Sequence, residues 1–311
     1  MVTSAKVKQI RALRGSLGFK FLFGPKRYSG VTYICPALTE TDFPFAVIPE
    51  NILPCGPIVM PFNTLEESDP ALMKWLDNGP TVMINLGSHV LSDEKVAREM
   101  ASAFRILLDY HDQQGSSNIQ VLWKAKASGD IQEVIDETLG KEIKEGRVKV
   151  VAWLEAEPVS ILQHPNLVCT VHHGGANSFY EGVWSAFSFV VFTEYLNSVS
   201  LNRSGVPHIV LPVWFDTYDY AQRAEFLNIG IFANKTCAPG VGAEEFGKAL
   251  VRVTGDSVEA GKLRTSAKYL KELCRAKGNG RELASAAILK EAGIRKRDYP
   301  LVVDSNISYK A

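Results

Sequence analysis

The sequence has no excess of either charge. It contains 34 basic residues (Lys and Arg) and 34 acidic residues, so its net charge is zero at pH 7. Surfaces that bind nucleic acid or anionic membranes carry clustered positive charge. The composition therefore favours neither nucleic acid nor an anionic membrane as a partner.

The sequence also lacks a long apolar run and a recognisable cysteine pattern. The apolar stretch AFSFVVF, residues 186–192, ends before Glu194 and is far shorter than the roughly 18 residues of a membrane span. Five cysteines, at 35, 55, 169, 237 and 274, fit neither a metal-binding spacing nor a disulfide framework. We therefore expect a soluble protein of a reducing compartment, with its cysteines packed internally.

Acidic side chains are missing from residues 1–39. Basic residues in this segment are Lys6, Lys8, Arg11, Arg14, Lys20, Lys26 and Arg27. Transit peptides share this bias, but the Gly-rich and aromatic stretch GSLGFKFLFGP (15–25) is more typical of a folded domain. We expect a cytoplasmic protein, with membrane association left open and mitochondrial targeting as the weaker alternative.

The chain is long enough for about two domains, with 311 residues and 46% hydrophobic content. Within residues 31–64, prolines stand at 36, 44, 49, 54, 57 and 61. Proline removes a backbone donor and interrupts helices, so this density favours an extended connector between domains.

Beyond residue 80, apolar runs alternate with helical patterns. We expect strands at 81–87, 119–124, 147–153, 167–171 and 208–212. We expect helices from a Ser92 N-cap to Leu108 and at 131–139, 158–164, 221–229, 243–255, 257–277 and 282–293. This alternation predicts an α/β fold with a doubly wound parallel sheet.

The stretch HHGGANSFYE (172–181) follows one of these strands and opens into a helix at Ala176. Gly174 and Gly175 have no Cβ, so the backbone can come close to a ligand. The first N–H groups of the helix then point at that ligand, and the helix end carries partial positive charge. The pattern predicts a cradle for an anion such as phosphate.

Other polar and aromatic residues also follow strands, where α/β sheets bind ligands. Each has a structural alternative. Trp153 could be a core aromatic or a platform for a base, and His172 and His173 point to opposite faces, which disfavours a metal pair. One His would pack and the other donate to a phosphate. The remaining candidates are Asn177 and Ser178 (ligands or caps), Glu181 (ribose ligand or solvated charge) and Asp216 (ligand or turn residue).

Six features occur in a fixed order: INLGS (84–88), Trp153, LQHPN (162–166), HHGGANSFYE (172–181), GVPHIVLP (205–212) and Asp216. This ordered set resembles the donor-binding half of the UDP-glycosyltransferase family, glycosyltransferase family 1, over about residues 45–292. The family has the GT-B fold of two facing Rossmann-like domains.

The resemblance implies a role for each matching residue. Trp153 would stack on uracil, Ser88 and His173 would contact the diphosphate, and Glu181 would bind ribose. The residues Gly175, Ala176, Asn177 and Ser178 would hold phosphate. Asp216 would bind sugar hydroxyls, and Thr217 belongs to the same donor site. The family uses a UDP-sugar as co-substrate, so neither a cofactor nor a metal is expected.

The chain also departs from the plant pattern of the family. Plant members have Trp at the position of Ala176 and Gln at that of Thr217, so the sugar remains unassigned. The spacing from Trp153 to His164 is two residues longer than in plants. HHGGA resembles the bacterial and fungal branch more closely, in which acceptors include sterols, lipids and polyketides.

Two larger departures from the family pattern concern the N-terminal domain and an insertion in the donor-binding domain. The family carries its acceptor-activating His in an N-terminal domain of roughly 200 residues, whereas no His precedes His89 here. We therefore expect no catalytic residue in this chain, a truncated N-terminal remnant at 1–44, a connector at 45–79, the UDP-sugar-binding domain at 80–295 and a tail at 296–311. Removing residues 186–204 restores the family's spacing, so we interpret them as a retained intron or a lineage-specific loop.

Three functions follow from these patterns. The first is a UDP-dependent hexosyltransferase that acts on a small lipophilic or sterol-like acceptor hydroxyl and is weakly active or inactive alone. The second is a non-catalytic UDP-sugar-binding module that needs a separate acceptor-domain chain. A nicotinamide-dependent dehydrogenase is the third, disfavoured because NLGSH replaces the G-x-G-x-x-G turn.

Overall fold

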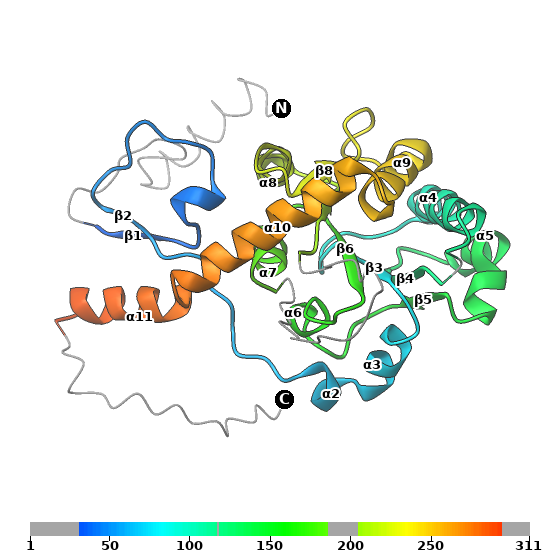
Figure 1. Cartoon of the computed structure of the whole chain (residues 1–311), viewed down its shortest axis with the longest axis horizontal. Coiled ribbons are helices and arrows are strands. Elements are labelled where there is room, and N and C mark those ends of the chain that lie inside the picture. Colours follow the sequence, from blue (N-terminus) through cyan, green and yellow to red (C-terminus); the bar gives the residue numbers. More distant parts are fainter. Residues whose placement is uncertain (1–30, 117, 186–204, 294–311) are drawn as a thin grey trace, which may run out of the picture. The chain divides into compact units, whose positions relative to one another are not determined.

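The structure, a computed structural model, describes residues 31–116, 118–185 and 205–293 (Figure 1). The expected insertion at 186–204, the tail at 296–311 and the basic segment before residue 31 lie outside the described residues. The chain divides into two compact units. The first includes residues 31–34 and 47–53 of the described chain, and the second includes 35–46 and everything from Pro54 onward.

The first elements are short. β1 (Tyr33–Cys35) pairs with β2 (Ile52–Pro54), and a 3-10 turn, η1, covers Thr39–Thr41. Next come α2 (Leu65–Ser68) and α3 (Pro70–Leu76), which lie within the connector expected at 45–79 but after the proline-rich residues 31–64. Thr64 caps α2 and Asp69 caps α3, with Pro70 at the first helical position. The domain boundaries expected at 44 and 79 stay predictions.

A six-stranded parallel sheet forms the centre of the second unit (Figure 1). Its strands run in the order β5-β4-β3-β6-β7-β8. Their bounds are β3 (Thr81–Asn85), β4 (Gln120–Lys124), β5 (Val148–Val151), β6 (Leu167–His172), β7 (His208–Val210) and β8 (Gly230–Phe232). The chain winds outward from β3 to β5, then returns and winds the other way from β6, so the doubly wound prediction is confirmed.

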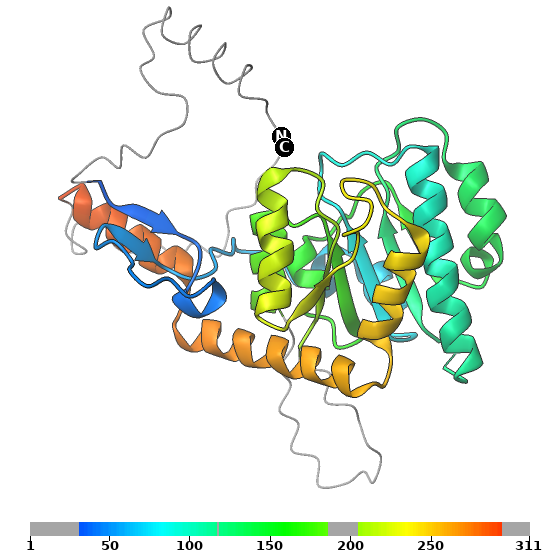
Figure 2. The same cartoon turned by 90° about the horizontal axis from the view of Figure 1, so that it is seen from above.

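Helices cover both faces of this sheet (Figure 2). One face packs on α4 (Glu94–Gln113), α5 (Gln132–Lys144) and α9 (Ala243–Thr254). The other packs on α3, α6 (Pro158–Ile161), α7 (Ala176–Ser185) and α8 (Phe215–Phe226). α10 (Val258–Ala276) contacts α7 and α9, and α11 (Gly280–Glu291) follows it. Alternation along β3 explains the two layers, because Val82 and Ile84 face one layer and Met83 the other.

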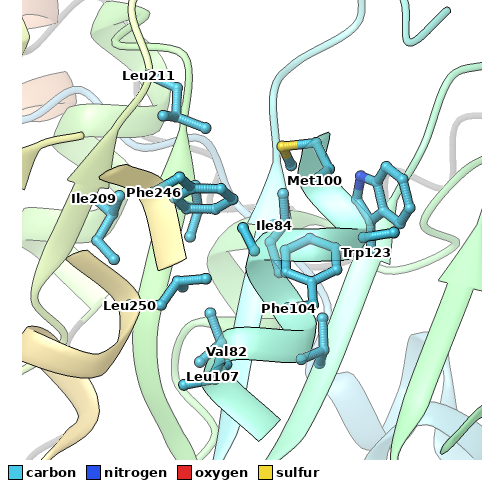
Figure 3. Close-up of a cluster of buried hydrophobic side chains, with 14 of the residues drawn as sticks. Val82, Ile84, Met100, Phe104, Leu107, Trp123, Ile209, Leu211, Phe246 and Leu250 are labelled. Carbon is cyan, nitrogen blue, oxygen red and sulfur yellow. The ribbon is translucent and has the colours of Figure 1, made fainter. Parts of the chain in front are cut away.

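The larger core lies between the sheet and α4 and α9 (Figure 3). The ring of Phe104 lies 5.3 Å from that of Trp123 and 6.0 Å from that of Phe246, both edge-on. Each side chain is fully buried. Burial of one such aromatic ring stabilises the fold by about 1.5–3 kcal/mol, which fixes the sheet that carries the loops described below.

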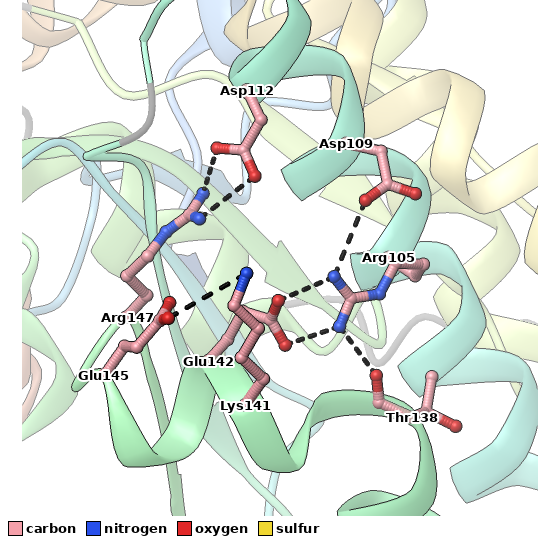
Figure 4. A network of polar contacts seen from close by, with 8 residues as sticks. All are labelled: Arg105, Asp109, Asp112, Thr138, Lys141, Glu142, Glu145 and Arg147. Carbon is pink, nitrogen blue, oxygen red and sulfur yellow. Dashed lines mark hydrogen bonds and ion pairs between the residues drawn. The ribbon is translucent and has the colours of Figure 1, made fainter.

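A partly buried ion pair joins α4 to α5 (Figure 4). The Arg105 guanidinium donates to Glu142 Oε1 at 2.7 Å and also to the Thr138 carbonyl. Glu142 is almost fully buried, and the hydrogen bonds from Arg105 lower its pKa. Each charge thus stabilises the other at the helix interface.

Several details differ from the sequence predictions. Asp93, not Ser92, caps α4, because its carboxylate accepts the Val96 N–H at 2.8 Å. α8 begins at Phe215, six residues before the predicted helix, and β8 was not predicted. Cys237 is exposed, so not every cysteine is a packing residue.

None of the helices in the described part of the chain combines the length and the apolar character that a membrane-spanning helix needs.

Candidate functional site

The direction of strand winding reverses between β3 and β6, and the loops after these two strands meet at the carboxyl edge of the sheet. The imidazole of His173 lies between two glycines there. A Cβ at Gly87 would lie 2.9 Å from its Cε1, and a Cβ at Gly175 would lie 2.5 Å from its Nε2. Gly87 also has a φ of +84°, which favours glycine. The two glycines therefore make room for the ring.

The same loop also contacts the start of α8. Gly174 has a φ of +85°, and a Cβ there would lie 2.5 Å from the Thr217 carbonyl oxygen. The Thr217 hydroxyl accepts the N–H groups of Val213 and Trp214, both at 3.2 Å, and the side chain is 0% exposed. Thr217 therefore shapes this loop with a buried hydroxyl, and its place in the donor site stays a prediction.

His172 is the packed member of the histidine pair. Its Nδ1 accepts the Gly174 N–H at 3.1 Å, so its Nε2 donates to His208 Nδ1 at 2.9 Å. Both rings are buried, and burial lowers the pKa of His208 to about 4 and that of His172 well below its usual range. The two neutral rings hold the loop after β6 against β7.

His173 is the member that is open to a ligand. The residue is half-buried, and its Nδ1, which is itself buried, has no hydrogen-bond partner within the described ranges. Burial lowers its pKa, opposed by the negative charge of Asp216 and reinforced by His89 and Lys124. A neutral imidazole has one N–H, so His173 can donate one hydrogen bond to an anion.

The N-terminus of α7 is adjacent to this ring. The first bond of the helix runs from the Phe179 N–H to the Gly175 carbonyl at 3.0 Å, so the N–H groups of residues 176–178 have no partner within the helix. Ala176 and Ser178 are partly buried and Asn177 is exposed. These groups offer partial positive charge and hydrogen-bond donors to an anion.

Glu181 lies further along α7 and carries an unusual carboxyl group. Burial raises its pKa from 4.5 to about 6. The Glu181 carboxyl has no hydrogen bond or ion pair among residues 31–116, 118–185 and 205–293. A partly buried acid without a partner is able to accept hydrogen bonds from ligand hydroxyl groups.

Trp153 follows β5, and its ring is 60% exposed, so it is not the core aromatic considered as an alternative. One face of the ring carries the ammonium of Lys124, 4.2 Å from the ring centroid. Lys124 ends β4 and was not among the predicted site residues. A lysine at the end of an apolar strand could have been predicted as a site residue from the sequence. Its contact with Trp153 could not, because that contact depends on β4 and β5 being neighbours in the sheet.

The two remaining predicted residues lie at the same edge. Ser88 is exposed in the loop after β3, where its carbonyl accepts Lys126 Nζ at 2.8 Å. Asp216 is exposed in the first turn of α8. The carboxyl edge of the sheet therefore brings together an aromatic platform, an anion cradle and two carboxylates, as a nucleotide with hydroxyl-bearing groups requires.

A polar cavity of about 610 Å³ opens at the opposite edge of the sheet, lined by residues such as Asp77, Asn118 and Asp256. These residues precede strands or follow α9, at the edge where parallel sheets do not carry their ligand sites. The cavity shares no residue with the constellation described above.

A comparison with the profiles of known protein families found no match. Glycosyltransferase sdnJ from Sordaria araneosa is 39% identical over 290 residues, covering 87% of this chain and 52% of that protein. UDP-glycosyltransferase 84B2 from Arabidopsis thaliana is 28% identical over 179 residues, covering 53% of this chain and 33% of that protein. The chain thus spans about half the length, or less, of these curated relatives.

Among solved structures, a UDP-glucosyltransferase from Polygonum tinctorium superposes with a TM-score of 0.60. The match covers 84% of this chain and 53% of that one at 19% identity. At that identity the likeness establishes the fold alone.

Proposed function

The chain is a UDP-glycosyltransferase-like protein with the fold of the donor-binding half of GT-B enzymes, and on this premise we propose that its strand-end site binds a UDP-sugar. The observation that carries the proposal is the position of His173. Its ring lies between Gly87 and Gly175, beside the N-terminus of α7, at the point where the strand order reverses.

Each part of a UDP-sugar then has a matching group. Trp153 offers the exposed face of its ring to uracil, and Glu181 accepts the ribose hydroxyls. His173, Ser88 and the backbone of residues 175–178 bind the diphosphate. Asp216, at the start of α8, accepts hydroxyls of the sugar.

The proposed reaction is hexosyl transfer to a small lipophilic or sterol-like acceptor. The bond from the anomeric carbon to the diphosphate oxygen breaks, and a bond to the acceptor oxygen forms. His173 and the α7 N-terminus stabilise the negative charge that develops on the leaving UDP. The acceptor hydroxyl passes its proton to a general base that we do not place in the described site.

A second candidate is a non-catalytic UDP-sugar-binding module that requires a partner chain for the acceptor. It is supported by the roles proposed above, because every residue assigned to the site would bind a part of the UDP-sugar and none would bind the acceptor. His172 and His208 form a buried neutral pair, so neither can reach an acceptor hydroxyl as a base.

Calorimetry on the full chain tests donor binding. We expect UDP to bind and NADH not to bind, and UDP binding to be unchanged by EDTA, because His173 and α7 replace a metal. Binding of NADH without UDP would contradict the proposal and favour the dehydrogenase.

Assays of sugar transfer, with and without an added acceptor-binding half, separate the two candidates. Turnover that requires the added half supports the module. Turnover by the chain alone, even if weak, supports the first candidate, the hexosyltransferase, and contradicts the non-catalytic module.

A further inference from the structure

Lys124 occupies a central position at the carboxyl edge of the sheet. It ends β4, and its side chain is 8% exposed. The ammonium donates to the Gly87 carbonyl at 3.1 Å and to Asn85 Oδ1 at 3.4 Å, and it lies 4.2 Å from the centroid of the Trp153 ring. One cation therefore connects the loop after β3 with the loop after β5.

No carboxylate compensates this charge. Among residues 31–116, 118–185 and 205–293, no acidic group forms an ion pair with Lys124. Burial lowers the pKa of Lys124, and the positive charge of Lys126 lowers it further. A covered ammonium without a counter-ion costs free energy, unlike Arg105, which has Glu142 as its partner.

The strand order explains what this cation faces. β4 lies between β5, which carries Trp153, and β3, which carries Gly87. In the proposed function, the base lies on Trp153 and the diphosphate lies by Gly87 and His173. Lys124 is close enough to His173 to affect its pKa through charge. The uncompensated charge therefore lies between the base and the phosphates.

We propose that Lys124 is an additional donor-site residue, whose ammonium supplies the counter-charge for the diphosphate and supports the inner face of the Trp153 ring. This role rests on the proposed function. Because the diphosphate is the missing counter-ion, Lys124 disfavours the empty site and favours the occupied one. Residues in binding sites often lower the stability of the free protein while they increase its affinity for the ligand.

The test compares Lys124→Met, which keeps the length of the side chain without its charge, with Lys124→Arg. Lys149→Met is the matched control, because Lys149 also lies over a tryptophan, Trp75, at 5.7 Å. Each full-length variant is titrated with UDP and with uridine, and its thermal unfolding is measured without ligand.

We expect K124M to weaken UDP binding on the order of tenfold and uridine binding by no more than about threefold, because only UDP carries the phosphates. K124R should bind UDP within about threefold of wild type, and K149M should bind it as wild type does. The free K124M chain should melt no lower than wild type, since an uncompensated charge is gone.

Three results would overturn this role: equal loss of UDP and uridine binding, a lower melting temperature of free K124M, or unchanged UDP binding by K124M. In these cases wild type still binds UDP, so the proposed function stands. If folded wild-type chain bound no UDP, the proposed function would fall, and the role of Lys124 with it.

Discussion

The imidazole of His173 lies against Gly87 so closely that a Cβ at position 87 would come within 2.9 Å of its Cε1. The two residues belong to loops that follow β3 and β6, the neighbouring strands at which the order of the sheet reverses. Their contact fixes the position of the ring beside the N-terminus of α7. The fit between a glycine and a histidine thus determines where an anion can bind.

Gly87→Ala should therefore displace the His173 ring and weaken UDP binding on the order of tenfold, the cost of one charge-assisted hydrogen bond. Gly115→Ala is the matched control, because Gly115 also has a positive φ but nothing within 4 Å of the added Cβ. Both variants bear similar backbone strain. Calorimetry with UDP should separate them, and equal affinities would show that the contact does not matter for binding.

UDP-sugar affinity should rise with pH through about 6, because burial raises the pKa of Glu181 to about 6 and the carboxylate accepts the ribose hydroxyls. By the same linkage, the free chain loses stability as pH rises from about 4.5 to about 6, since the folded state holds this proton longer. Titrations with UDP-glucose avoid the phosphate ionisation near pH 6 that UDP itself would show.

Glu181→Gln should remove this pH dependence and leave a lower, constant affinity. Glu133→Gln, on the exposed face of α5, should keep the wild-type profile. If E181Q retained the rise in affinity near pH 6, another group would be responsible for it.

Trp153→Ala should weaken both UDP and uridine on the order of ten- to a hundredfold, the magnitude of one lost base–aromatic stack. Because the ring is 60% exposed, the melting temperature should change little. Trp153→Phe should retain most of the affinity. Unchanged uridine binding by W153A would place the base elsewhere.

Arg105→Met should lower the free energy of unfolding at pH 7 by about 2–3 kcal/mol, because Glu142 would remain buried without its partner. Arg98→Met should have little effect, since Arg98 pairs with Glu94 and Glu137 on the exposed surface. Urea unfolding measures both variants.

The pKa of Glu142 is lowered, so the stabilisation from its pair with Arg105 should be present above about pH 4.5 and decrease as the pH falls. Equal unfolding midpoints for R105M and R98M at pH 7 would contradict this account of Figure 4.

Most of the sheet could be predicted because most of its strands are apolar runs, which can be recognised in the sequence without knowledge of the fold. β8, Gly230–Phe232, was missed because it directly follows the helical pattern expected at 221–229, so no separate apolar run marks it. α2 and α3 were missed although their capping residues, Thr64 and Asp69, stand in the sequence. Both helices are short, so neither forms the repeating apolar pattern on which the helix predictions relied.

The site divides in the same way. The strand end, glycine pair and helix start at 172–181 could be predicted because these parts are adjacent in sequence. The pairing of His172 with His208, the hydrogen bonds that cover Thr217 and the contact of Lys124 with Trp153 join residues on different elements. Such contacts depend on which strands are neighbours in the sheet, and local sequence patterns do not determine the strand order.

Hydrogen–deuterium exchange on the full chain, with and without UDP, tests most directly whether the carboxyl edge of the sheet is the donor site. The account predicts slower exchange in peptides that cover residues 86–89 and 172–181, with no change at 110–119 and 254–257 around the opposite cavity. Protection confined to the opposite edge, or no protection at saturating UDP, would contradict it.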